Sequence, residues 1–121
     1  MKKVIITGAT GMIGKGVLLE CLDHEVISEV MVIGRKSMNI NHPKLKELVH
    51  KDFTNFYEVR DQLSGYDACY FCLGISAAGL SEEQYTNITY KYTMTLANTL
   101  LELNKDMTFI RINANRHVML C

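Results

Sequence analysis

Three glycines near the start of the chain have a spacing that could bind phosphate. Gly8, Gly11 and Gly14 follow the apolar residues 4–6, and apolar residues at helical spacing begin at Ile13. A helix that starts in this way presents unpaired backbone N–H groups and a partial positive charge, which together attract phosphate. Gly8 would allow the sharp turn, Gly11 the approach of a pyrophosphate, and Gly14 the close packing of helix on strand. The alternative is a glycine-rich turn that merely packs.

Two basic residues follow the next apolar run, residues 29–34. Such a continuous run is expected of a parallel strand that is buried on both faces, and Arg35 and Lys36 stand at its end. In a dinucleotide-binding fold this position faces the adenosine ribose, where an acid binds the 2′-hydroxyl of NAD and an arginine can bind the 2′-phosphate of NADP. A base in place of the acid favours NADP over NAD. The alternative is a solvated pair of loop residues.

Residues 7–14, TGATGMIG, resemble the cofactor loop of the extended and atypical short-chain dehydrogenase/reductases. This group contains nucleotide-sugar epimerases and NAD(P)H-binding regulators, and the resemblance extends over most of the chain. It implies a Rossmann domain that binds NADP or NAD. The reaction that it implies is hydride transfer by the nicotinamide, with the protein supplying orientation.

The resemblance also implies contacts at the ends of two later strands. In this family an acid after the third strand commonly contacts the adenine amino group, and Asp52 with Phe53 matches that position. Asp52 could equally cap the segment that follows it. Residues 72–74 match a turn that lies against the ribose on the nicotinamide side, where glycine permits close approach. The predicted cofactor-binding residues are Gly8, Thr10, Gly11, Met12, Ile13, Gly14, Arg35, Lys36, Asp52, Phe53, Cys72, Leu73 and Gly74.

Strand and helix signals alternate along the chain and predict an α/β fold. The predicted strands lie in residues 4–6, 29–34, 48–49, 67–74 and 107–112, and a short helix is predicted at 56–63. By analogy with dinucleotide-binding domains, five such strands form a doubly wound parallel sheet, a Rossmann fold, with strand order 3-2-1-4-5. Residues 1–112 are assigned to this domain. Residues 113–121 are assigned to a short atypical tail, which would leave the edge of the fifth strand uncovered.

Residues 82–104 are predicted to form one long helix. Ser81 and Gln84 fit a capping box at its start, and apolar residues recur along it at helical spacing. In the family that the chain resembles, this helix commonly helps to build a two-fold dimer interface, which implies a homodimer. The alternative is a long core helix of a monomer.

The catalytic residues of that family have no counterpart in this sequence. The family places a Ser or Thr just beyond the fifth strand and then a Tyr-x-x-x-Lys pair, in which Lys lowers the tyrosine pKa for proton exchange with the substrate. None of the six tyrosines is followed four residues later by a lysine. We therefore predict no catalytic residue in this chain. The sequence leaves two functions open: the NAD(P)-binding domain of an atypical short-chain reductase or epimerase-like oxidoreductase, and a non-catalytic NADP(H)-sensing regulator that acts through dimer or partner binding.

The composition narrows the class of partners. Lys plus Arg and Asp plus Glu both number 13, so no overall field favours nucleic acid or an anionic membrane. The apolar stretch before Thr7 is too short for a signal peptide, and no stretch approaches a membrane span, which predicts a cytoplasmic protein. The cysteines suit reduced core thiols, and Cys69 and Cys72 would point to opposite faces of a strand. No spacing suggests a metal site.

Overall fold

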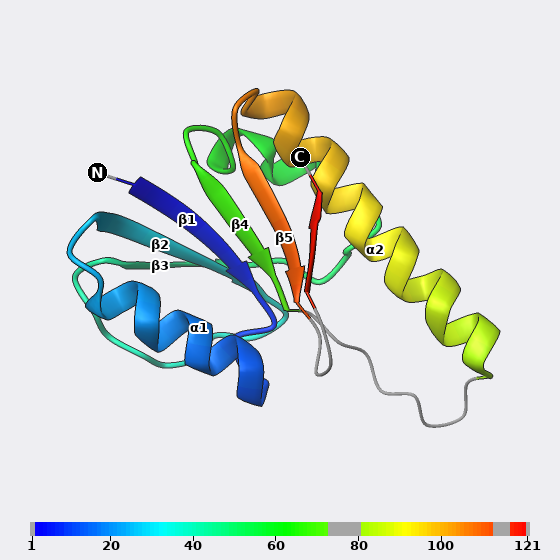
Figure 1. The fold of residues 1–121 in the computed structure, drawn as a ribbon, viewed down its shortest axis with the longest axis horizontal. Coiled ribbons are helices and arrows are strands. Elements are labelled where there is room, and N and C mark those ends of the chain that lie inside the picture. Colours follow the sequence, from blue (N-terminus) through cyan, green and yellow to red (C-terminus); the bar gives the residue numbers. More distant parts are fainter. Residues whose placement is uncertain (1, 73–80, 113–116, 121) are drawn as a thin grey trace.

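The predicted strands and helices form in the computed structural model, which describes residues 2–72, 81–112 and 117–120 (Figure 1). The strands are β1 (Lys2–Thr7), β2 (Ile27–Gly34), β3 (Leu45–Val49), β4 (Ala68–Phe71), β5 (Thr108–Ile112) and β6 (His117–Leu120). The helices are α1 (Met12–Asp23), the 3-10 helix η1 (Tyr57–Gln62) and α2 (Glu82–Leu103). Within the described ranges, none of these helices is long and apolar enough to cross a bilayer.

The sheet has the order β3-β2-β1-β4-β5-β6, and β1 to β5 are parallel. This confirms the predicted doubly wound order 3-2-1-4-5. The order reverses between β1 and β4, and ligands of such sheets bind outside the carboxyl ends of the strands at the point of reversal. The two strand ends meet there, because the Cys72 N–H donates to the Thr7 carbonyl oxygen at 3.2 Å.

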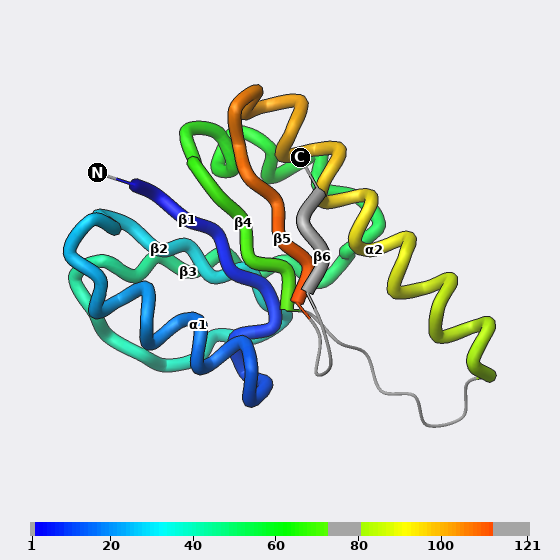
Figure 2. The backbone as a smooth tube through the Cα atoms, viewed as in Figure 1, coloured from blue at the N-terminus to red at the C-terminus, as the bar shows by residue number. Residues whose placement is uncertain are grey.

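Alternate residues of β1 enter two separate cores. Val4 and Ile6 pack with Leu18 of α1 on one face of the sheet. Ile5 belongs to a second cluster, which includes Leu96 of α2. In Figure 2 the backbone of α1 runs beside the β1 and β2 part of the sheet, and that of α2 beside the β5 part. Because alternate residues of β1 point to opposite faces, α1 and α2 cover opposite faces of the sheet.

The predicted capping box is present at the start of α2. The Gln84 N–H donates to the Ser81 Oγ at 3.1 Å, and the Ser81 N–H donates to the Gln84 Oε1 at 2.9 Å. The helix ends at Leu103, and the N–H of the C-cap residue Asn104 donates to the Leu100 carbonyl oxygen at 2.8 Å. The predicted helix at 82–104 is thus confirmed to within one residue.

The short helix predicted at 56–63 is a 3-10 helix. The Val59 N–H donates to the Phe56 carbonyl oxygen at 3.2 Å, and the Leu63 N–H donates to the Arg60 carbonyl oxygen at 3.0 Å. These i to i+3 bonds define the tighter helix, which is common in short connecting pieces. Phe56 and Leu63 are both buried. Over one or two turns, a 3-10 helix and an α-helix both bring residues three or four apart to the same side. The apolar spacing therefore could not tell which type of helix would form.

The expectation that the edge of the fifth strand is uncovered was wrong. β6 pairs antiparallel with β5, and Ile110 lies opposite Met119. An edge strand presents unpaired N–H and C=O groups, and a neighbouring extended segment can pair with them. The sequence carried a signal for this strand, because residues 118–120 are an apolar run.

Candidate functional site

The glycine loop between β1 and α1 has the geometry that its spacing predicts. Gly8 has a φ of +72°, a left-handed conformation that glycine adopts without strain. The Gly11 N–H donates to the Gly8 carbonyl oxygen at 3.1 Å and closes the turn. A Cβ atom placed on Gly14 would lie 2.0 Å from that same oxygen. The first turn of α1 therefore lies so close to the loop that a larger residue at this position would force the backbone apart.

The start of α1 is open to solvent and free of acidic side chains. Gly11 is the N-cap residue, and no side chain of the described residues caps this helix. Asp and Glu are absent from the first turn, and the side chains of Met12 and Ile13 are 92% and 37% exposed. The first N–H groups of a helix have no carbonyl partner within it. They can therefore donate to an anion, which the helix dipole also favours.

A cavity of about 360 Å³ joins the glycine loop to the basic residues after β2. β1 and β2 are parallel, and Thr7 pairs with Ile33. The glycine loop after β1 and the loop after β2 therefore begin at the same edge of the sheet. Arg35 and Lys36 have exposed side chains here. The cavity is lined by Gly8, Ala9, Thr10, Val32, Ile33, Gly34, Arg35, Lys36 and Met38. The structure thus places the glycine loop and the basic pair, Arg35 and Lys36, around one cavity.

The side chain of Asp52 is engaged locally. Its Oδ1 accepts hydrogen bonds from the hydroxyl and from the N–H of Thr54, and these bonds hold the pKa of Asp52 below its usual range. These bonds form a turn within the loop and not the helix cap that the sequence left open, because η1 begins at Tyr57 with Phe56 as its N-cap and no side-chain cap. Phe53 is buried, and its ring packs edge-on against Phe56 with the centroids 5.3 Å apart. Neither Asp52 nor Phe53 lines the 360 Å³ cavity, so their contact with adenine stays a prediction.

Cys72 lies beside the end of β1, and Leu73 and Gly74 fall outside the described residues. Burial, and to a lesser extent the neighbouring Cys21, raises the pKa of Cys72 to about 11. Cys69 is fully buried in the core that includes α2. Its thiol pKa is also raised, mainly by burial. Neither thiol is therefore ionised near neutral pH, as a reactive cysteine pair would require.

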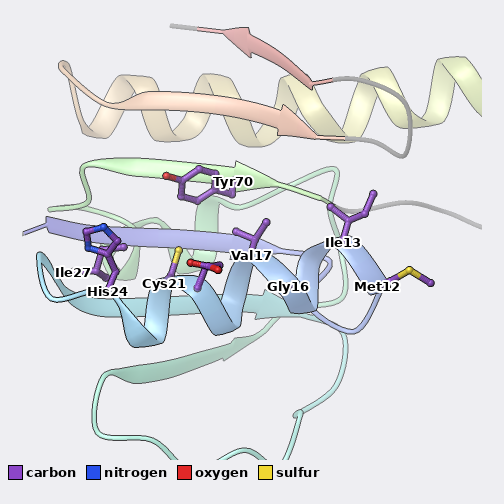
Figure 3. Close-up of a pocket in the computed structure, with 9 residues that line it drawn as sticks. Met12, Ile13, Gly16, Val17, Cys21, His24, Ile27 and Tyr70 are labelled. Carbon is purple, nitrogen blue, oxygen red and sulfur yellow. The ribbon is translucent and has the colours of Figure 1, made fainter.

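A larger cavity, of about 630 Å³, lies along the flank of α1 (Figure 3). In Figure 3 the side chains of Ile13 and Val17 project from α1 on the side of β4, where Tyr70 lies. Among the described residues, none lines both this cavity and the 360 Å³ cavity. The walls are mostly apolar, and the titratable side chains among them are Glu20, Cys21, His24 and Tyr70. This cavity could therefore pack against an apolar group, but it does not bring a set of reactive side chains together at one point.

Tyr66, which lies just before β4, has both an acidic and a basic side chain close to it. Its hydroxyl donates to Glu29 Oε2, and Lys3 Nζ lies 5.1 Å from its ring centroid. Burial and then the hydrogen bond to Glu29 raise the pKa of Tyr66 above its usual range. Tyr66 lies beside the amino ends of the strands and away from the glycine loop, so it is not placed to act on a ligand at that loop. The described residues also contain no group of three His, Cys, Asp or Glu side chains that could hold a metal ion.

The sequence profile of the NAD dependent epimerase/dehydratase family matches residues 4–115. The chain belongs to this family. Protein HTATIP2 of Rattus norvegicus is 26% identical over 95 residues, which make up 77% of this chain and 39% of the rat protein. The family match covers the glycine loop, the basic pair and the five parallel strands apart from the first two residues of β1.

Two solved structures show the same fold. A mutant of uronate dehydrogenase from Agrobacterium tumefaciens, complexed with NAD, is 20% identical with a TM-score of 0.67, over 92% of this chain and 40% of that one. A UDP-N-acetylglucosamine 4-epimerase from Bacillus cereus is 15% identical with a TM-score of 0.67, over 92% of this chain and 35% of that one. The chain thus spans less than half the length of these relatives. It has the NAD(P)-binding fold of the family.

Proposed function

We propose that this chain binds NADP, with NAD as the second choice, as the nucleotide-binding domain of an atypical short-chain reductase or epimerase-like oxidoreductase. The observation that carries this proposal is the approach of Gly14 to the Gly8 carbonyl oxygen, a contact that a Cβ atom would block. The loop residues Gly8, Ala9 and Thr10 line the 360 Å³ cavity and lead into the uncapped start of α1, an arrangement suited to a pyrophosphate with an adenosine next to it. Membership of the NAD dependent family supports the same ligand.

The phosphate groups are the part of the ligand that the described residues accommodate best. The N–H groups of Met12 and Ile13 would donate to the pyrophosphate, and Gly11 leaves room for it to approach. Arg35 and Lys36 would bind the 2′-phosphate, because a guanidinium fork matches the geometry of phosphate oxygens. The net charge of the chain is zero, so the attraction would come from these local groups and not from an overall field.

The remaining contacts follow from the family resemblance. Asp52 and Phe53 would contact the adenine, and Cys72, Leu73 and Gly74 would lie against the ribose on the nicotinamide side. When bound, the nicotinamide supplies hydride chemistry, and the residues of this chain supply its orientation.

The alternative is a cytoplasmic, non-catalytic regulator that senses NADP(H) through a change in dimerisation or partner binding. This alternative requires no Tyr-x-x-x-Lys pair, and the 121 residues contain none. Tyr66 has Lys3 Nζ near its ring, but its hydroxyl donates a hydrogen bond to Glu29. A sensor would bind NADPH without consuming it when a panel of carbonyl compounds is added, whereas a reductase would oxidise it.

Calorimetric titration with NADPH and NADH tests the proposal. The Arg35→Ala variant is expected to bind NADPH at least about tenfold more weakly and NADH almost unchanged, since NADH lacks the 2′-phosphate. Arg60→Ala is the matched control, because Arg60 is exposed and stacks on Tyr57, 4.2 Å from its ring centroid. If the original chain binds neither nucleotide, the proposal fails. If Arg60→Ala weakens NADPH as much as Arg35→Ala does, the location of the phosphate is wrong.

A further inference from the structure

A side chain of β3 holds the loop that carries the basic pair. The Met38 N–H donates to the Glu47 Oε2 at 3.1 Å, and this hydrogen bond is partly buried. β2 and β3 are parallel, and Glu47 lies opposite Val32. Side chains of directly paired residues lie on the same face of a sheet, so Glu47 shares a face with Val32, which lines the 360 Å³ cavity.

The loop turns sharply just after the basic pair. Asn39 has a φ of +56°, a left-handed conformation, and its N–H donates to the Ser37 Oγ at 3.2 Å. Met38 lies inside this turn, lines the 360 Å³ cavity and packs against the apolar cluster on the α1 side of the sheet. A hydrogen bond from an N–H group to a carboxylate is stronger than one to a neutral acceptor. The Glu47 carboxylate therefore restrains both the turn and the cavity wall.

We propose that Glu47 is a positioning residue for the adenosine side of the nucleotide site. Its carboxylate holds the Met38 N–H, and through Met38 it keeps Arg35 and Lys36 where they can bind a 2′-phosphate. The inference rests on the proposed binding of NADP and adds a specificity determinant from β3. Glu47 itself acts through the loop and not by touching the nucleotide.

Affinities for NADPH and NADH in two Glu47 variants test this role. Glu47→Ala removes the acceptor and is expected to weaken NADPH binding about tenfold, with a smaller loss for NADH. Glu47→Gln keeps a weaker, neutral carbonyl oxygen as the acceptor and is expected to weaken NADPH binding by about threefold, less than Glu47→Ala does. Glu58→Ala is the control, since Glu58 is an exposed acid on η1. A loss in Glu47→Gln as large as that in Glu47→Ala would overturn the hydrogen-bond role.

Hydrogen exchange at the Met38 amide gives a readout that needs no nucleotide. Protection is expected in the original chain and in Glu47→Gln, and its loss is expected in Glu47→Ala, with circular dichroism as the check that this variant is folded. If Glu47→Ala loses protection but binds NADPH normally, the positioning role is wrong while the proposed function stands. If the original chain binds neither nucleotide, the proposed function fails and the inference fails with it.

Discussion

Gly14 and Gly16 lie in the same helix, but their surroundings differ. A Cβ atom on Gly14 would meet the carbonyl oxygen of Gly8 at 2.0 Å and its carbonyl carbon at 2.6 Å. A Cβ atom on Gly16 would meet nothing within 4 Å. Inside a helix, alanine is more favourable than glycine by about 1 kcal/mol. The two positions therefore separate the close contact at the glycine loop from ordinary helix propensity.

Opposite effects on stability are expected for alanine at these two positions. Gly14→Ala should lower the free energy of unfolding by about 3 kcal/mol or more, because backbone atoms would have to move apart. Gly16→Ala should raise it by roughly 0.5–1 kcal/mol. Urea denaturation of the two variants beside the original chain measures both changes. Equal stability of Gly14→Ala and the original chain would mean that the loop and helix are not in this contact.

Local spacing predicts some site residues and leaves others hidden. The turn at Gly8 and the close approach at Gly14 follow from their order along the chain, as does the place of Arg35 at the end of a strand. The contact between Met38 and Glu47 could not be predicted in this way. It depends on the register between β2 and β3 and on the path of the loop that joins them.

At the scale of the element, α2 is defined by its ends. The reciprocal hydrogen bonds between Ser81 and Gln84 satisfy two N–H groups at the start of the helix. At the other end the Asn104 side chain links α2 to the turn before β4, because its Oδ1 accepts from the N–H groups of Gly65 and Tyr66. The ends of α2 therefore set its boundaries and tie its last turn to the sheet.

Removal of the cap should destabilise the chain without altering the nucleotide site. Ser81→Ala is expected to lower the free energy of unfolding by about 1 kcal/mol, since an N-cap hydroxyl is lost. Ser64→Ala, at an exposed position after η1, is the control and should change it little. Urea denaturation with a circular dichroism signal measures both. A stability of Ser81→Ala equal to that of Ser64→Ala would contradict the cap.

Elements with their own start and stop signals were predicted from sequence, and those that depend on a neighbour were not. The capping box located α2, and the continuous apolar run located β2. The tail was not expected to form a strand, although residues 118–120 are apolar, because four residues carry a weak strand signal until they pair with a neighbour such as β5. For η1, apolar spacing gave the position but not the type of helix.

At the scale of the whole molecule, α2 has a buried face and an exposed one. Thr93, Leu96 and Leu100 are buried toward the sheet, whereas Tyr90 is 62% exposed. Figure 1 shows that the first turns of α2 extend away from the sheet. We propose this exposed part of α2 as the contact surface of the homodimer that the family resemblance implies.

The homodimer makes a prediction about mass in solution. Sedimentation equilibrium should give the mass of a dimer, and Tyr90→Asp should shift it toward the monomer, because a charge would be buried at the contact. Leu19→Asp is the matched control, since Leu19 is 55% exposed on α1. A monomer at all concentrations, or an equal shift in both variants, would contradict an interface on α2.

The most direct test of the central claim is an NMR titration of the isotope-labelled chain with NADPH. Binding at the glycine loop predicts that the largest shift changes fall on the backbone amides of Gly11, Met12, Ile13 and Arg35, since these groups would donate to phosphate oxygens or lie beside them. Changes centred on His24 and Tyr70, with Gly11 and Arg35 unmoved, would place the ligand in the larger cavity along α1. That result, or no change at all, would contradict a nucleotide site at the start of α1.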